Sequence, residues 1–246
     1  MTENELIDLI VKTCDFSAPL HGMNFEDKFN GIIKELGTDQ VYLAWGISRG
    51  VIVPLHEPFV IKIPFTHVCI DDDCYSYEQI EEDYGEFVPE NFYQEGEYFY
   101  PINDIEEGDY CDMECAIYER AKEAGVEEVF AEEHFVYCHE DINIYVQAKA
   151  DSFEYYDSAS LTSKMTADKM EAAKTSINKI CDDPSHHERW CFNLIWLSQV
   201  LIIFGKEYVD KLFDFLNNEC ITDLHLGNLG YIENIPVIFD YASFNG

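Results

Sequence analysis

The chain has few basic residues: 15 Lys and Arg stand against 49 Asp and Glu among its 246 residues. The resulting formal net charge of −34 at pH 7 repels nucleic-acid phosphates and anionic lipid head groups. We therefore expect no direct binding to nucleic acid and no binding to a membrane. The same charge attracts positively charged surfaces, so a basic protein is the partner that this composition favours.

Long apolar runs are also missing. The longest, from Leu194 to Phe204, is too short to span a bilayer and is interrupted by Ser198 and Gln199. The first residues carry no basic stretch ahead of an apolar one, so we expect no secretory signal.

The cysteines form no recognisable framework. They are nine in number, and an odd set of scattered cysteines is typical of reduced thiols in a cytoplasm. Two groups could be considered for zinc, but neither has a strong ligand spacing: Cys181, His186, His187 and Cys191, and Cys111 with Cys115.

Residues 71–114 contain no Lys or Arg, but they hold seventeen Asp and Glu and ten Tyr and Phe. Charge alone would leave such a segment disordered, whereas its aromatic side chains are dense enough to pack. We expect an ordered acidic insertion with irregular backbone. The side chains expected to pack inward are Tyr75, Tyr84, Phe87, Phe92, Tyr98 and Phe99.

The rest of the composition is that of a folded chain, with 47% hydrophobic and 15% aromatic residues. Apolar runs bounded by turn residues predict strands at 41–45, 50–54, 59–63, 127–130, 135–137 and 143–147. Helical spacing of apolar residues predicts helices at 4–12, 24–36, 112–124, 167–181, 188–204 and 207–217. Strands dominate the first part and helices the second, which indicates an α+β chain.

Three polar residues near the end of the sequence have a spacing that suits Mg-nucleotide chemistry. Asp223 is followed five residues later by Asn228, and Asp240 ends a short apolar strand. Amide and carboxylate oxygens can hold Mg²⁺, while another carboxylate accepts the proton of a nucleophile. Each residue also has a purely structural explanation: Asp223 as a helix-end cap, Asn228 as a turn residue and Asp240 as an acid at the end of a strand. Their joint spacing favours the metal-nucleotide site.

Segment 223–228 resembles the D-x-H-x-G-N catalytic loop of the protein-kinase-like superfamily, in the form found in aminoglycoside phosphotransferases and kinase-like phage proteins. The resemblance implies that Asp223 is the catalytic base, that Asn228 and Asp240 bind Mg²⁺, and that ATP is the cofactor. Two positions depart from protein kinases: Ile221 replaces the histidine of H-R-D, and Tyr241 replaces the phenylalanine of D-F-G.

A second part of the resemblance lies upstream. The triplet ending at Lys62 resembles the V-A-I-K strand, which implies that Lys62 contacts the nucleotide phosphates. Its glutamate partner is expected on the inner face of the following helix. We choose Glu114 over Glu119, because only Glu114 shares a helical stripe with apolar residues: Ile117, Tyr118 and Ala121.

The glycine loop of the family is nearly absent. Residues 36–44 resemble a first strand pair with a shortened loop, in which Gly37 alone would approach the phosphates. Residues 144–149 would form the hinge at which adenine docks. The resemblance ends at Phe244, before any activation segment or A-P-E motif, so we expect no platform for a peptide substrate.

The resemblance implies a two-lobed kinase-like fold with a truncated C-terminal helical lobe. Its expected parts are a helical extension at 1–35, a β-rich N-lobe at 36–147 with the acidic insertion at 71–111, and a helical C-lobe at 148–246.

Two functions remain open. The first is a minimal phage-type phosphotransferase in the cytoplasm, which would be that of the host cell for a phage protein. The second is an inactive kinase fold whose acidic surface mimics nucleic acid. Such a protein would inhibit a basic host-defence nuclease or another DNA- or RNA-binding protein.

Overall fold

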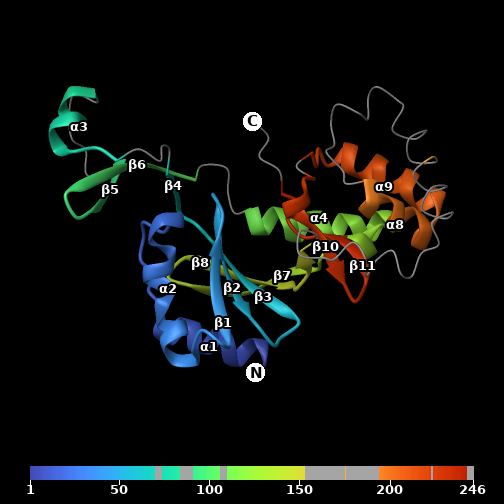
Figure 1. Ribbon diagram of the computed structural model, residues 1–246, viewed down its shortest axis with the longest axis horizontal. Coiled ribbons are helices and arrows are strands. Elements are labelled where there is room, and N and C mark those ends of the chain that lie inside the picture. The colour runs from blue at the N-terminus through green and yellow to red at the C-terminus, as the bar shows by residue number, and fades with distance from the viewer. Residues whose placement is uncertain are drawn as a thin grey trace. The chain divides into compact units, whose positions relative to one another are not determined.

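The computed structural model describes residues 1–69, 74–83, 91–105, 110–152, 175, 194–222 and 224–242. The chain is α+β, with helices and antiparallel sheets (Figure 1). It forms two compact units that interleave in sequence: residues 1–112 with 134–147, and residues 113–133 with 148–246. No helix in the described part of the chain is long and apolar enough to cross a membrane.

The first unit contains a five-stranded sheet in the order β1-β2-β3-β8-β7. Its strands are β1 (Val41–Trp45), β2 (Arg49–Pro54), β3 (Phe59–Pro64), β7 (Glu133–His139) and β8 (Ile142–Ala148). These strands confirm five of the six predicted from apolar runs. The register pairs Ala44 with Val51 and Val51 with Lys62, so these three residues share one face of the sheet.

Helices α1 (Glu3–Thr13) and α2 (Gly22–Leu36) share a hydrophobic core with the opposite face of this sheet. Helix α2 lies so close to β2 that a Cβ on Gly50 would sit 2.2 Å from the Phe25 ring. Residues 1–35, expected to form a helical extension, therefore belong to the core of the first unit.

The acidic segment is more regular than expected in its described residues. Strands β4 (His67–Cys69), β6 (Tyr98–Asp104) and β5 (Phe92–Glu95) form a small sheet in that order, and α3 spans Tyr77–Asp83. Irregular backbone was therefore the wrong prediction for these parts. The alternation of strand residues explains it, because side chains on one face can pack while carboxylates on the other face remain in water.

The predicted aromatic packing is correct for part of the set. Phe92 and Phe99 are buried with Ile80, and Tyr75 packs against this cluster. Tyr98 is instead 53% exposed, because its neighbour Phe99 takes the inward position on β6. Tyr84 and Phe87 lie outside the described residues.

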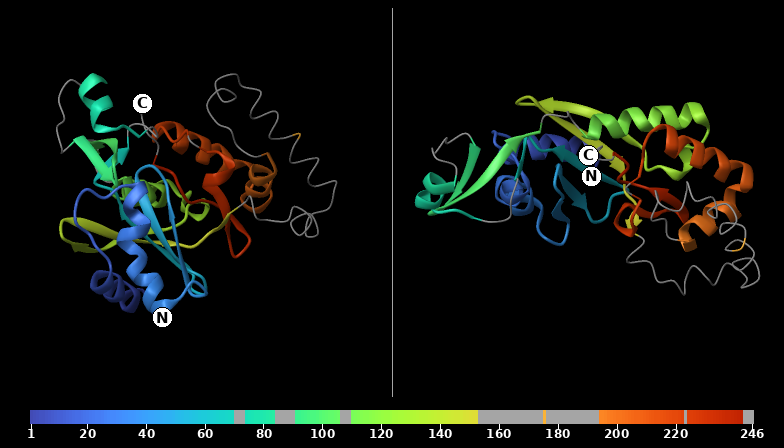
Figure 2. Two further views of the ribbon diagram at one scale, coloured as in Figure 1. Left: turned by 60° about the vertical axis from the view of Figure 1, so that its left-hand side comes forward. Right: turned by 90° about the horizontal axis from the view of Figure 1, so that it is seen from above.

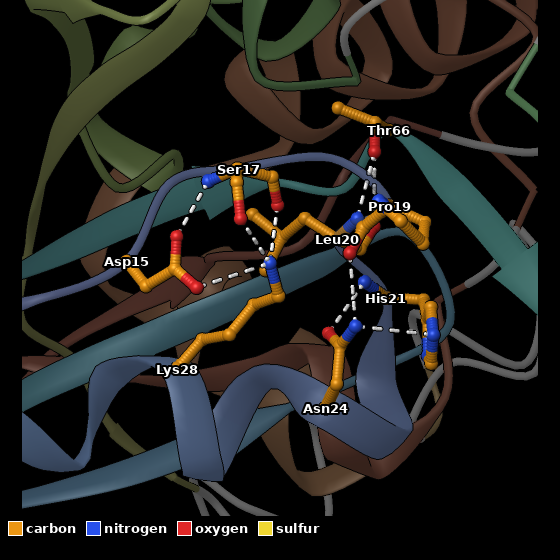
Figure 3. A network of polar contacts seen from close by, with 8 residues as sticks. All are labelled: Asp15, Ser17, Pro19, Leu20, His21, Asn24, Lys28 and Thr66. Carbon is orange, nitrogen blue, oxygen red and sulfur yellow. Dashed lines mark hydrogen bonds and ion pairs between the residues drawn. The ribbon is translucent and has the colours of Figure 1, made fainter. Parts of the chain in front are cut away.

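A polar network fixes the start of α2 (Figure 3). The His21 backbone N–H donates to Asn24 Oδ1 at 3.1 Å, and Asn24 Nδ2 lies 2.9 Å from the Pro19 carbonyl oxygen. Asn24 Nδ2 also lies 3.2 Å from Nε2 of the fully buried His21 ring. Lys28 donates to the carbonyl and hydroxyl oxygens of Ser17. These bonds hold the loop before α2 against the helix.

His21 makes the stability of this network depend on pH. Burial, followed by the positive charges of His67 and Lys28, lowers the pKa of His21 to about 4. The unfolded chain, with the ordinary pKa near 6.5, takes up this proton first, so stability is lost as pH falls below about 6.5. At pH 5 the expected loss is about 2 kcal/mol.

Denaturant unfolding at pH 7 and pH 5 measures this loss in the wild type and in His21→Gln, which keeps an acceptor for Asn24 but does not titrate. The free energy of unfolding should fall more in the wild type, by roughly the 2 kcal/mol given by linkage. Parallel falls in the two proteins would contradict this role of His21, because the carboxylates titrate in both.

The second unit packs helices against a three-stranded sheet, ordered β11-β10-β9. Its strands are β9 (Asp151–Ser152), β10 (Leu229–Ile232) and β11 (Ile235–Ile238), and its helices are α4 (Tyr110–Ala124, from Met113 onward), α8 (Leu194–Phe204) and α9 (Lys206–Asn218). Both views of Figure 2 show α8 and α9, in orange, near the red β10–β11 hairpin. The core of this unit includes Trp196, Leu212 and Tyr231.

Most helix predictions agree with the described residues, but one strand prediction is wrong. Residues 127–129 form a short 3-10 helix, because the N–H groups of Val129 and Phe130 bond back to Val126 and Glu127. Gly125, at φ 68°, follows the end of α4, in agreement with the predicted helix at 112–124. The helix predicted at 167–181 lies outside the described residues except for Thr175, and so do residues 188–193 and the Cys181–Cys191 group.

Candidate functional site

A tight hairpin positions the end of the site segment in the second unit. Glu233 and Asn234 form a two-residue turn with φ values of 50° and 73°, the positive pair that suits a right-twisted hairpin. The register pairs Leu229, which follows Asn228, with Ile238, which lies two residues before Asp240. The hairpin therefore brings Asn228 and Asp240, two of the predicted site residues, to the same end of the sheet.

A backbone bond between the two arms fixes this approach. The Phe239 N–H donates to the Asn228 carbonyl oxygen at 3.0 Å. Asn228 ends the 3-10 turn η4 (Leu226–Asn228), in which its own N–H donates to the His225 carbonyl oxygen at 3.0 Å, and its side chain is only 7% exposed. Asn228 and Asp240 therefore lie on adjacent, hydrogen-bonded backbone.

Helix α4 supports the other side of Asp240. Oε1 of Glu114 accepts the Tyr241 N–H at 2.9 Å and the Ala242 N–H at 3.3 Å. Glu114 is fully buried on the stripe predicted from helical spacing, whereas Glu119 forms an exposed ion pair with Lys122. Two charge-assisted bonds from α4 thus hold the backbone that follows Asp240.

Tyr241 is a residue whose role the sequence did not reveal. Its ring is buried edge-on against Phe130, with ring centroids 5.2 Å apart, and its hydroxyl donates to the Ala131 carbonyl oxygen at 3.0 Å. Burial, and next the charge of Glu114, raises the pKa of Tyr241 well above its usual value, so the phenol stays neutral. The sequence showed Tyr241 only as a departure from D-F-G, although an apolar ring after the acid is itself an anchoring signal.

Asp240 therefore stands between two fixed neighbours, Phe239 and Tyr241. Its own side chain is partly exposed. The Asp240 carboxylate and the buried side-chain amide of Asn228 both offer oxygen atoms of the kind that a hard cation binds.

Other glycine and histidine positions in this loop have structural explanations. His225 Nδ1 accepts the Gly227 N–H at 2.9 Å, which is a local hydrogen bond within the loop. A Cβ on Gly230 would lie 2.5 Å from the Asp151 carbonyl oxygen, so β9 can pair closely with β10 only at glycine. Asp223, the predicted catalytic base, lies outside the described residues.

Lys62 lies in the first unit, on β3. Lys62 is only 4% exposed. It lies on the sheet face that carries Ala44 and Val51, which is opposite to the face that packs against α1 and α2. A buried ammonium group is costly unless it is paired with an anion, so its burial sets Lys62 apart from an ordinary surface lysine.

The placement of Gly37 differs from the prediction. Gly37 ends α2 at φ 93°, and its N–H donates to the Ile33 carbonyl oxygen at 2.8 Å, so helix termination explains the glycine. Residues 36–44 contain a helix end and one strand, not a strand pair. The turn between the first two strands is formed by residues 46–48, where the Gly46 N–H donates to the Arg49 carbonyl oxygen at 2.9 Å.

The described residues thus bring together Glu114, Asn228 and Asp240 in the second unit, and Lys62 has its own buried position in the first. Comparison with protein-family models, with curated proteins and with solved structures finds no match to this chain.

Proposed function

We propose that this chain binds ATP with Mg²⁺ and acts as a minimal kinase-like phosphotransferase. The main observation in favour of this proposal is that hydrogen bonds hold the backbone on both sides of Asp240. Its preceding residue bonds to Asn228, and its following residue bonds to the buried carboxylate of Glu114. Phosphoryl transfer depends mainly on positioning and charge stabilisation, and a carboxylate fixed on both sides by backbone bonds meets the first requirement.

The donor set fits Mg²⁺. Asn228 and Asp240 offer amide and carboxylate oxygens from adjacent backbone, and Mg²⁺ usually takes one or two such protein ligands together with phosphate oxygens and water. When bound, Mg²⁺ would neutralise charge on the phosphates. The protein's own part is to keep Asp240 in place through Tyr241 and Glu114.

The order of elements along the chain also supports the proposal. Helix α4 follows β3 and precedes the β7–β8 hairpin in sequence, and β8 lies beside β3 in the sheet. This is the order that the family resemblance implies for a nucleotide-binding lobe. Lys62 would then donate to the phosphates, while the side chains of Ala44 and Val51 on the same face of the sheet would contact the base. Asp223 would accept the proton of the attacking hydroxyl group.

Thermal unfolding with ATP and Mg²⁺ tests this proposal. Binding at 100 times the dissociation constant should stabilise the protein by about 2.7 kcal/mol, seen as a rise in Tm that EDTA removes. Lys62→Met should lose most of the rise, measured from its own ligand-free Tm. Lys34→Met, which changes an exposed lysine on α2, should keep it. No rise in the wild type at millimolar ATP and Mg²⁺ would refute nucleotide binding.

A second candidate function rests on the small acidic sheet. Tyr77 and Tyr98 are exposed there, beside exposed carboxylates on α3, β5 and the β5–β6 turn: Glu78, Glu82, Glu95 and Glu97. Aromatic side chains among carboxylates suit a basic protein surface. If ATP produces no thermal shift while the protein inhibits a basic nuclease in a salt-dependent way, this second function is favoured.

A further inference from the structure

One edge of the five-stranded sheet is a candidate binding surface for an extended peptide. β7 is the last strand in the order of the sheet, and no other strand of the described residues pairs with its outer side. It is seven residues long and contains neither lysine nor proline, two residues with which proteins often protect such edges. Phe135 and Tyr137 are exposed along it.

A small hollow runs beside this edge. It has a volume of about 160 Å³ and lies between helix α1 and β7. Its walls combine apolar side chains with two polar ones: Ile7, Val11, Val136 and Tyr137, and Asn4 and Asp8. An apolar side chain on an added strand could enter this hollow while the strand backbone pairs with β7.

The charge around the edge selects the partner. Within the first unit, residues 134–147 contain Glu140 and Asp141 and no Lys or Arg, and Asp8 adds a carboxylate from α1. Glu140 and Asp141 form the exposed turn at one end of β7. A second copy of this chain would bring the same carboxylates and a further net charge of −34 to the interface, which opposes pairing of two β7 edges.

We propose that β7 binds an extended segment of another protein in which basic residues alternate with apolar ones. The apolar side chains fill the hollow between α1 and β7, and the basic side chains meet the surrounding carboxylates. This proposal is independent of nucleotide binding, because it uses other residues of the first unit.

Fluorescence anisotropy with a labelled peptide of alternating lysine and valine tests the proposal on the full chain. Two control peptides separate the contributions: one is N-methylated at consecutive backbone amides, so that both edges are blocked, and the other has glutamate in place of lysine. We expect at least tenfold weaker binding for each control, because the first cannot complete the strand pairing and the second has the wrong charge. Equal binding of the N-methylated peptide would overturn the proposal, because it would show charge attraction alone.

Two protein variants locate the site. Tyr137→Thr should weaken binding about tenfold, and Asp8→Asn should weaken it severalfold at low salt and less at high salt. Trp45→Thr is the matched control, because Trp45 has nearly the same exposure, 47% against 46% for Tyr137, but lies on β1 at the opposite edge. Equal loss in Tyr137→Thr and Trp45→Thr, with unchanged Tm, would overturn the assignment to β7. So would a self-association in sedimentation that Tyr137→Thr abolishes, because a second copy would then occupy the edge.

Discussion

Replacing Asp240 with asparagine is expected to abolish Mg-dependent ATP turnover. The substitution keeps the size of the side chain and the backbone bonds of Phe239 and Tyr241, but it removes the negative charge proposed to face the metal. Loss of one charge-stabilising group typically costs roughly 10²–10³-fold in rate, and a metal ligand should cost at least that much. Phosphate release measured with and without EDTA gives the rate.

His225→Ala is the control for this variant. His225 bonds to the nearby Gly227 N–H and has an exposed side chain, so much of the turnover should remain. Both variants should unfold at temperatures close to that of the wild type. Equal turnover by wild type and Asp240→Asn would show that the activity comes from another site or from a contaminant.

The local elements of this fold were predictable because their signals are local. The five confirmed strands are apolar runs bounded by turn residues, and Glu114 was found on the buried face of α4 from spacing alone. The strand prediction failed at residues 127–129, where local bonds from Val129 and Phe130 back to Val126 and Glu127 form a 3-10 helix shortly after Gly125.

The role of Gly37 could not be decided from the sequence. A glycine before a strand can approach a phosphate or end a helix, and both roles use the same conformational freedom. Only the position of α2 distinguishes them, because Gly37 bonds back to Ile33.

Tyr241 was overlooked for a related reason. Its hydroxyl reaches the Ala131 carbonyl, a contact between residues 110 positions apart in the chain. The aromatic ring after the acid indicates an anchor, but no pattern within the sequence indicates its distant partner.

The backbone on either side of Asp240 is held by residues from two other parts of the chain, Asn228 and Glu114. The spacing of Asn228 and Asp240 suggested that they belong together, but it gave no reason for Glu114 to approach them. In the second unit Glu114 bonds to the backbone after Asp240. The family resemblance gives the same glutamate a second role, as the charged partner of Lys62.

Substitutions of Glu114 by alanine and by glutamine are expected to separate these two roles. Both backbone bonds end on one oxygen of Glu114, so Glu114→Gln can keep them through its amide oxygen. Glu114→Ala removes them and leaves two N–H groups without this partner, at a cost of about 1–3 kcal/mol each. Denaturant unfolding should therefore show a loss of several kcal/mol in Glu114→Ala and a much smaller loss in Glu114→Gln.

Nucleotide binding should respond differently from stability. Glu114→Gln lacks the negative charge proposed to hold Lys62, so its thermal shift with ATP and Mg²⁺ should fall well below that of the wild type although its fold is intact. Glu119→Gln is the matched control on the same helix, because Glu119 forms only an exposed pair with Lys122 and should leave both measurements unchanged. If Glu114→Gln binds ATP as tightly as the wild type, Glu114 supports the backbone after Asp240 and has no part in holding Lys62. If Glu114→Ala proves as stable as the wild type, the bonds to Tyr241 and Ala242 do not stabilise the second unit.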